Sequence, residues 1–132
     1  SVIVSMVPSC LFTPISIVPS CLYTEPEIAS VGLTETQARE KGVQIRVGRY
    51  DMKGNGQQII SRETGGFIKV IFAANSDVLL GAQIMCARAT DMIGELATAL
   101  ANGLTSTQLM YAMRAHPTFN EAVSKAVEDS RE

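Results

Sequence analysis

The sequence predicts an α+β fold, in which an antiparallel β-sheet carries helices packed on one of its faces. Strand patterns dominate the first part of the chain and helical patterns the last part, so the two kinds of element are segregated. Two consecutive strand patterns with a short turn between them indicate an antiparallel hairpin. A helical segment after the hairpin carries one apolar stripe, which another layer must cover. With 132 residues, 46% of them hydrophobic, the chain can form one compact core.

Residues 1–22 are apolar, but they predict neither a signal peptide nor a membrane helix. The first basic residue is Arg39, whereas a signal peptide begins with a positively charged region. A spanning helix needs roughly 20 uninterrupted apolar residues, and three prolines would break one here: Pro8, Pro14 and Pro19. We therefore expect an extended segment and no association with a membrane.

Residues 7–13 (VPSCLFT) recur almost unchanged as residues 18–24 (VPSCLYT). The second copy leads into the rest of the chain, so we expect the compact domain to comprise residues 18–132. Residues 1–17 then form an extended, partly duplicated segment of unassigned role, because two copies are too few for a stacked repeat. The chain begins at Ser1 and not at a methionine, so we expect it to be a piece of a longer protein.

The first helix of the domain is expected to begin at Thr34, whose side chain can form a capping box with Gln37. Gly42 can then end that helix in the left-handed conformation. Residues 43–47 alternate between apolar and polar side chains, which is strand periodicity. The phase of the apolar positions shifts at Gly48, and this shift predicts a β-bulge there.

The next glycines, Gly54 and Gly56, are expected to form a turn around Asn55. They do not predict a dinucleotide-binding loop, since that pattern requires a third glycine and a following helix. Residues 67–73 and 78–85 predict the two strands of the hairpin, with residues 75–77 as its turn.

Three helices are expected after the hairpin. The first spans residues 89–102 and has apolar residues at helical spacing: Met92, Ile93, Leu96, Ala97 and Leu100. A short second helix begins at Thr105, which can pair with Gln108 in a capping box. The third is expected over residues 118–128, with a buried face made of Phe119, Ala122, Val123, Ala126 and Val127. Helical spacing alone leaves open whether four residues belong to the core or to a dimer contact: Met92, Leu96, Met110 and Met113.

Charge and cysteine content exclude several kinds of function. The net charge of −2 is scattered along the chain, so no basic surface is available for nucleic acid. Cys10, Cys21 and Cys86 form no CxxC pair and no cluster with histidine, so we expect neither a metal site nor a local redox couple. An odd number of cysteines suits a reducing compartment, and we expect a cytoplasmic protein.

His116 is the only histidine of the chain and its clearest candidate for chemistry. Pro117 biases the residue before it away from helical geometry, so we expect His116 in a loop just before the last helix. Glu121 lies one turn into that helix and can reach back to one ring nitrogen, which would fix the tautomer of the imidazole. The other nitrogen could then take a proton from a thiol.

The same spacing has structural alternatives, and the residues alone leave them open. A lone histidine more often has a structural role than a catalytic role. Glu121 could complete a capping box with Thr118, three residues before it. It could also form an ion pair with Lys125, four residues after it, worth about 0.2–0.5 kcal/mol.

The HPTFNE sequence at residues 116–121 resembles the C-terminal signature His-Pro-Thr-x-x-Glu of the flavoprotein disulfide reductases, or pyridine nucleotide-disulfide oxidoreductases. Other segments resemble the C-terminal interface domain of that family in the same order: TEPEIASVGLT (24–34), GFIKV (66–70), LGAQI (80–84) and ATDMI (89–93). The resemblance extends from about residue 18 to near the C-terminus. It implies that this chain is the C-terminal dimerisation domain of such an enzyme.

Within the family, the sequence AHPT at residues 115–118 and EAV at residues 121–123 are most similar to the dihydrolipoamide dehydrogenases. Glutathione-reductase-like members usually have an acidic residue where this chain has Ala122. Mercuric-reductase-like members have a C-terminal cysteine pair, and no cysteine follows Cys86 here. Two positions depart from the lipoamide enzymes: Arg114 replaces a second histidine, which bears on the substrate, and Asp91 replaces a glutamate, which keeps the charge.

The resemblance implies a homodimer in which His116 enters the active site of the partner subunit as acid/base and Glu121 orients it. The backbone of His116 and Pro117 would approach the FAD of the partner. The parent enzyme would oxidise the lipoyl group of dihydrolipoamide and reduce NAD, using FAD and NAD domains upstream of this chain. Since the chain contains neither a GxGxxG motif nor the Cys-x4-Cys redox pair, we expect the isolated chain to bind neither cofactor and to be inactive.

Three alternatives remain at the level of sequence. The chain could be the interface domain of another family member, such as a glutathione- or mercuric-reductase-like enzyme. It could be a dimerisation or binding module without a catalytic part. It could also be a small regulatory domain that binds a metabolite, although no cluster of polar residues supports a metabolite site.

Overall fold

A computed structural model describes residues 16–63 and 65–132 and contains one five-stranded antiparallel sheet in the order β1-β2-β5-β4-β3. The strands are β1 Ser20–Leu22, β2 Glu27–Gly32, β3 Ile45–Asp51, β4 Phe67–Ala73 and β5 Leu79–Cys86. β4 and β5 form the predicted hairpin, which lies at the centre of the sheet. The first copy of the duplicated segment, residues 7–13, lies outside the described residues.

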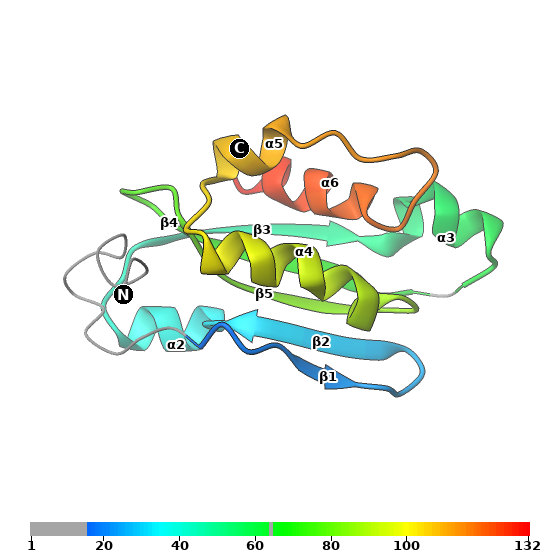
Figure 1. Cartoon of the computed structure of the whole chain (residues 1–132), viewed down its shortest axis with the longest axis horizontal. Coiled ribbons are helices and arrows are strands. Elements are labelled where there is room, and N and C mark those ends of the chain that lie inside the picture. The colour runs from blue at the N-terminus through cyan, green and yellow to red at the C-terminus, as the bar shows by residue number, and fades with distance from the viewer. Residues whose placement is uncertain (1–15, 64) are drawn as a thin grey trace.

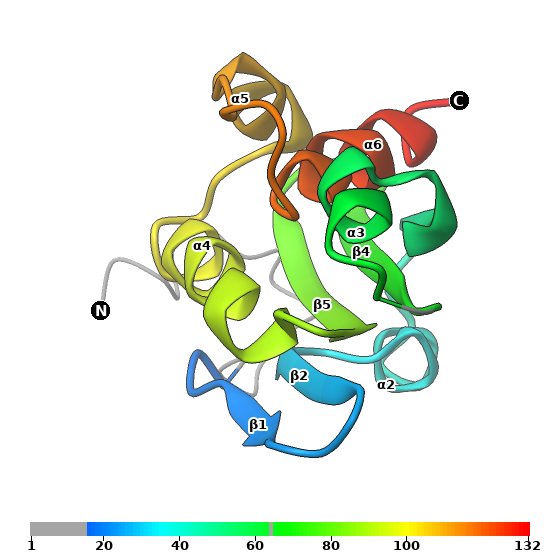
Figure 2. The ribbon, with the colours of Figure 1, turned by 90° about the vertical axis from the view of Figure 1, so that its right-hand side faces the viewer.

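The two longest helices, α4 (Ala89–Ala101) and α6 (Glu121–Asp129), lie on the same face of the sheet (Figures 1 and 2). α4 packs on β2 and β5, and α6 packs on β3 and β4. The short helix α2 (Glu35–Glu40) lies on the opposite face, near β3. The predicted fold class is therefore confirmed, with α2 as an addition to the second face.

The core fills the space between the sheet and helices α4 and α6. Alternate residues of the strands point into it, because successive side chains of a strand face opposite sides. Its largest members have essentially no exposed surface, and they include Ile68, Val70, Phe72, Ile84, Met92, Leu96, Val123 and Val127. Met92 and Leu96 thus belong to the core, whereas Met110 is partly exposed and Met113 is fully exposed. In the described residues, no helix has the length and hydrophobicity needed to span a bilayer.

The predicted bulge at Gly48 is wrong. β3 pairs with β4 without interruption from Ile45 opposite Ala73 to Asp51 opposite Phe67. Gly48 instead lies against α6, where an added Cβ would be 1.9 Å from the carbonyl oxygen of Ala126.

Two other predictions at helix starts need correction. Gly54 and Gly56 do not form a simple turn, because a 3-10 helix (Met52–Gly54) is followed by helix α3 (Gly56–Ile60), which Asn55 caps. The last helix begins at Glu121 and not at Thr118, whose hydroxyl donates to the carbonyl of Ala115 instead. The capping boxes that begin α2 and α5 (Ser106–Tyr111) form as predicted.

Candidate functional site

His116 lies in the loop that joins α5 to α6, and its side chain is 78% exposed. Residues 112–120 form neither helix nor strand, as expected for a segment interrupted by Pro117. Nδ1 of His116 lies 2.8 Å from Oε1 of Glu121, the first residue of α6. The sequence prediction that this carboxylate reaches back to the imidazole is thus met by the geometry, while Nε2 forms no hydrogen bond with the described residues.

Glu121 also holds the backbone of the loop, because its other oxygen accepts a hydrogen bond of 3.4 Å from the N–H of Thr118. This contact is half of the capping box considered above. The alternative ion pair with Lys125 does not form, since Lys125 lies near Glu128 at 3.5 Å. One carboxylate therefore fixes both the imidazole and the chain next to it.

Two buried polar residues next to the site could not be assigned from local sequence signals. The side chain of Arg114 is 5% exposed and forms an ion pair with Glu95. Asn55 is 3% exposed and donates to the carbonyl of Thr118 across 63 positions of sequence. The pairing of such distant segments has no signal within either segment.

A hollow of about 450 Å³ lies beside the imidazole, between the end of β3 and the start of α6. Gly56 lines this hollow, and a Cβ added to Gly56 would lie 4.0 Å from Cε1 of His116. Its lining combines the two predicted catalytic residues with neighbours from β3, the 3-10 helix, α3, α6 and the segments between them. These residues are Tyr50, Gly54, Asn55, Gly56, Arg114, His116, Glu121, Ala122, Ser124 and Lys125. Pro117 faces a second hollow of about 390 Å³ beside the start of α4.

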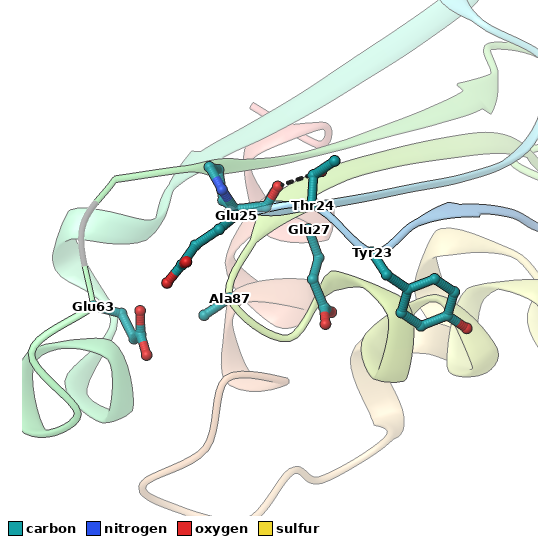
Figure 3. A pocket seen from close by; sticks show the side chains of 7 residues that line it. Tyr23, Thr24, Glu25, Glu27, Glu63 and Ala87 are labelled. Carbon is teal, nitrogen blue, oxygen red and sulfur yellow. Dashed lines mark hydrogen bonds between the residues drawn. The ribbon is translucent and has the colours of Figure 1, made fainter.

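A separate acidic hollow of about 440 Å³ lies at the β1–β2 turn, where the side chains of Glu25, Glu27 and Glu63 gather (Figure 3). Among the described residues, no three or more histidine, cysteine, aspartate or glutamate side chains are arranged so that they could hold a metal ion. Glu27 already accepts hydrogen bonds from the backbone N–H and the hydroxyl of Thr90, at 3.1 and 2.7 Å. Its carboxylate thereby caps the start of α4.

The described cysteines do not form a redox pair. Cys86 is a free, fully buried thiol whose Sγ lies 3.6 Å from Sδ of Met92. Burial raises the pKa of the Cys86 thiol, so this group remains protonated and unreactive at neutral pH. Cys21 is half-buried and also free, and Cys10 lies outside the described residues.

An exposed imidazole that a carboxylate orients can exchange a proton with a group outside its own domain. The exposed pair is thus placed where a group from another domain or subunit could reach it. Residues 18–127 match the profile of the pyridine nucleotide-disulphide oxidoreductase dimerisation domain. The chain belongs to this family, as the resemblance of its motifs implied.

Individual curated relatives of this chain are dihydrolipoyl dehydrogenases of bacteria. The chain is 41% identical over 104 residues to a dihydrolipoyl dehydrogenase of Bacillus subtilis, covering 79% of this chain and 22% of that protein. It is 42% identical over 105 residues to one of Rhizobium etli, covering 80% and 22%. The chain thus spans about a fifth of the length of these curated relatives.

Solved structures of similar fold include the HOCl-induced flavoprotein disulfide reductase RclA of Escherichia coli. It superposes with a TM-score of 0.81 at 27% identity, over 84% of this chain and 26% of that one. LpdA of Mycobacterium tuberculosis also has a TM-score of 0.81, with 23% identity, over 88% of this chain and 26% of that one. The latter likeness concerns the fold alone.

Proposed function

We propose that this chain is the dimerisation domain of a dihydrolipoamide dehydrogenase and that it supplies His116 and Glu121 to the active site of the partner subunit. The proposal depends mainly on one observation, the 2.8 Å contact between Nδ1 of His116 and Oε1 of Glu121 on an otherwise exposed imidazole. The curated relatives named dihydrolipoyl dehydrogenase support this branch of the family.

In the proposed reaction, His116 moves a proton and Glu121 directs it. The carboxylate favours the neutral tautomer with the proton on Nδ1, which leaves a lone pair on Nε2 pointing away from the domain. Nε2 takes the proton of one dihydrolipoamide thiol, and the resulting thiolate attacks the redox disulfide of the parent enzyme, forming a mixed disulfide and releasing one cysteine thiolate. The second dihydrolipoamide thiol, deprotonated in turn by Nε2, attacks the mixed disulfide, which closes the lipoyl disulfide and releases the second cysteine. Glu121 stabilises the imidazolium until Nε2 returns the proton to a leaving thiolate.

FAD, when bound by the parent, would carry the two electrons of the dithiol towards NAD. In the proposed enzyme, this chain contributes to cofactor binding only through the backbone of His116 and Pro117. Both residues are exposed, and the carbonyl oxygen of His116 accepts no hydrogen bond from the described residues, so it is open to an N–H donor of a flavin ring. Phosphate-binding turns for FAD and NAD would belong to upstream domains, because this chain has no GxGxxG motif.

The proposed assembly is a homodimer in the cytoplasm. A symmetric dimer would bring each exposed imidazole opposite the upstream domains of the other subunit. The free, buried thiol of Cys86 suits a reducing compartment.

A domain exchange tests the proposed function. The matching C-terminal segment of the Bacillus subtilis relative is replaced by residues 18–132, and NAD reduction by dihydrolipoamide is measured. We expect an active enzyme, and we expect His116→Gln to lower kcat/KM by about 10²–10⁴-fold because it removes the acid/base. Glu40→Gln, which changes an exposed charge on α2 and away from the hollow beside His116, serves as the control.

A dimeric, FAD-loaded chimera that reduces a different disulfide but does not oxidise dihydrolipoamide would point to another member of the family. Unchanged turnover in His116→Gln would overturn the acid/base role itself. The isolated 132-residue chain is expected to reduce no NAD in the same assay.

A further inference from the structure

Arg114 lies two residues before the catalytic candidate, and its buried guanidinium joins three helices. Nε and Nη2 contact the carboxylate of Glu95 in α4, at 3.0 and 3.1 Å. Nη1 donates to the hydroxyl of Ser124 in α6 at 2.6 Å, and to two carbonyl oxygens at the end of α5, those of Leu109 and Ala112. The segment that enters the loop is thus fixed at one point.

Asn55 fixes the other side of the same loop. Its amide Nδ2 donates to the carbonyl oxygen of Thr118 at 3.0 Å, two residues after the histidine. Its Oδ1 accepts from the N–H of Gln58 at 3.0 Å, so the same side chain also caps α3. The loop therefore lies between two buried side chains, and we call Arg114 and Asn55 the loop clamp.

We propose that the loop clamp positions His116 for proton transfer, so that Arg114 and Asn55 are positioning residues of the site. The imidazole is 78% exposed, so packing around the ring cannot hold it within hydrogen-bond reach of Glu121. Its orientation depends on the backbone of residues 114–118, which forms no helix or strand of its own. A small displacement of this backbone would break the Nδ1 contact, and reactions that depend on orientation are sensitive to such shifts.

The chemistry of Arg114 explains why this residue type serves the clamp. Only a guanidinium offers five N–H donors in one rigid plane, enough for a carboxylate, a hydroxyl and carbonyl oxygens at once. A lysine would retain the charge near Glu95 but lose the planar set of bonds. The arginine at this position thus connects α4, α5 and α6 at the point where the loop begins.

The importance of the clamp for catalysis rests on the proposed function, but its effect on the imidazole is measurable without catalysis. His116 is the only histidine, so a ¹⁵N-histidine-labelled sample of the full chain gives a single imidazole spectrum. In its neutral form the ring reports which nitrogen carries the proton, and in the intact chain this is expected to be Nδ1. Methyl spectra of the core check that each variant remains folded.

Four variants distinguish the effect of the loop clamp on the tautomer of His116 from a general effect of lower stability. Arg114→Gln should shift the proton to Nε2, and Arg114→Lys should restore part of the Nδ1 form. Asn55→Asp keeps the acceptor that caps α3 but loses the donor to Thr118, so it should also reduce the Nδ1 form. Arg46→Gln removes another arginine–carboxylate ion pair, to Asp77, and should leave the imidazole spectrum unchanged.

Folded Arg114 and Asn55 variants with the original tautomer would overturn the proposal. An equal shift in Arg46→Gln would also overturn it, because the effect would then follow stability and not position. If Arg114→Gln fails to fold, Arg114→Lys and Asn55→Asp decide the question. Failure of the proposed function would be recognised separately, by an inactive chimera whose tautomer pattern is as expected.

Discussion

Glu121 is the residue on which most of the site depends. One of its oxygens contacts the imidazole of His116, and the other accepts from the backbone of Thr118. The same carboxylate therefore orients the ring and shapes the loop. Its side chain is 28% exposed, so the pair remains accessible to a group from outside the domain.

Replacing Glu121 by alanine in the domain-exchange enzyme should lower kcat by about 10²-fold or more, because the imidazole loses both its tautomer preference and its charge partner. Steady-state rates with dihydrolipoamide measure this loss, and Glu128→Ala, on the same helix, is the matched control. A Glu121→Ala enzyme that retains its full rate would show that the ring is oriented by something else.

Local sequence patterns predicted those site residues whose partners lie within a few positions along the chain. Pro117 places its neighbour in a loop, and the five-residue spacing from His116 to Glu121 brings the two together. It could not find Arg114 or Asn55, because their partners lie 19 and 63 positions away in the sequence. The burial of Arg114 is a property of how three helices pack, which no local pattern encodes.

Helix α2 is attached to the sheet by a charged contact. Glu35 lies 2.7 Å from Nζ of Lys69 in β4 and 2.8 Å from Arg39 in its own helix. The hydrogen bond from Lys69, followed by that from Arg39, lowers the pKa of Glu35 from 4.5 to about 2. A carboxylate with a lowered pKa stabilises the fold above its unfolded pKa, and the contribution is lost as the pH falls towards the folded pKa.

The free energy of unfolding should therefore decrease between about pH 5 and pH 2, partly through Glu35. Glu35→Gln should flatten the curve in this window, and Glu40→Gln, an exposed carboxylate of the same helix, should not. Urea unfolding at several pH values, followed by circular dichroism, measures the difference. Parallel curves for the two variants would contradict the assigned contribution.

The contact between α6 and β3 depends on the absence of a side chain at Gly48. An added Cβ would lie 1.9 Å from the carbonyl oxygen of Ala126 and 2.8 Å from Cβ of Ser130. Sequence periodicity detected something unusual at this glycine but assigned it to a bulge. The cause is a helix about 80 positions later, as the hydrogen bond from the Arg49 N–H to Asp129 also indicates.

Gly48→Ala should destabilise the domain by about 2 kcal/mol or more, since α6 must move away from the sheet. Gly94→Ala is the matched control, because an added Cβ there meets nothing within 4 Å in the middle of α4. That control should stabilise by about 0.5–1 kcal/mol through helix propensity. Thermal unfolding of both variants tests the pair, and a harmless Gly48→Ala would contradict the close packing.

The domain as a whole exposes several large apolar side chains. Tyr111 is 81% exposed and Met113 is 98% exposed, at the end of α5 and in the loop that carries His116. Ile59 and Ile60 of α3 are also exposed. Tyrosine and methionine are enriched at protein interfaces, so these positions suit contact with a second subunit.

The fold class, its hairpin and its main helices could be predicted from periodicity, whereas the exposure of these apolar side chains could be found only from the packed structure.

In the proposed dimer, His116 acts in the active site of the partner subunit. Subunit mixing in the domain-exchange enzyme tests it most directly. One subunit carries His116→Gln and the other lacks its redox cysteines, so each homodimer is inactive, and mixed dimers are confirmed by native mass spectrometry. If the histidine acts across the interface, random mixing should restore about a quarter of the activity, since half of the dimers then contain one complete site. Mixed dimers that remain inactive would contradict the account.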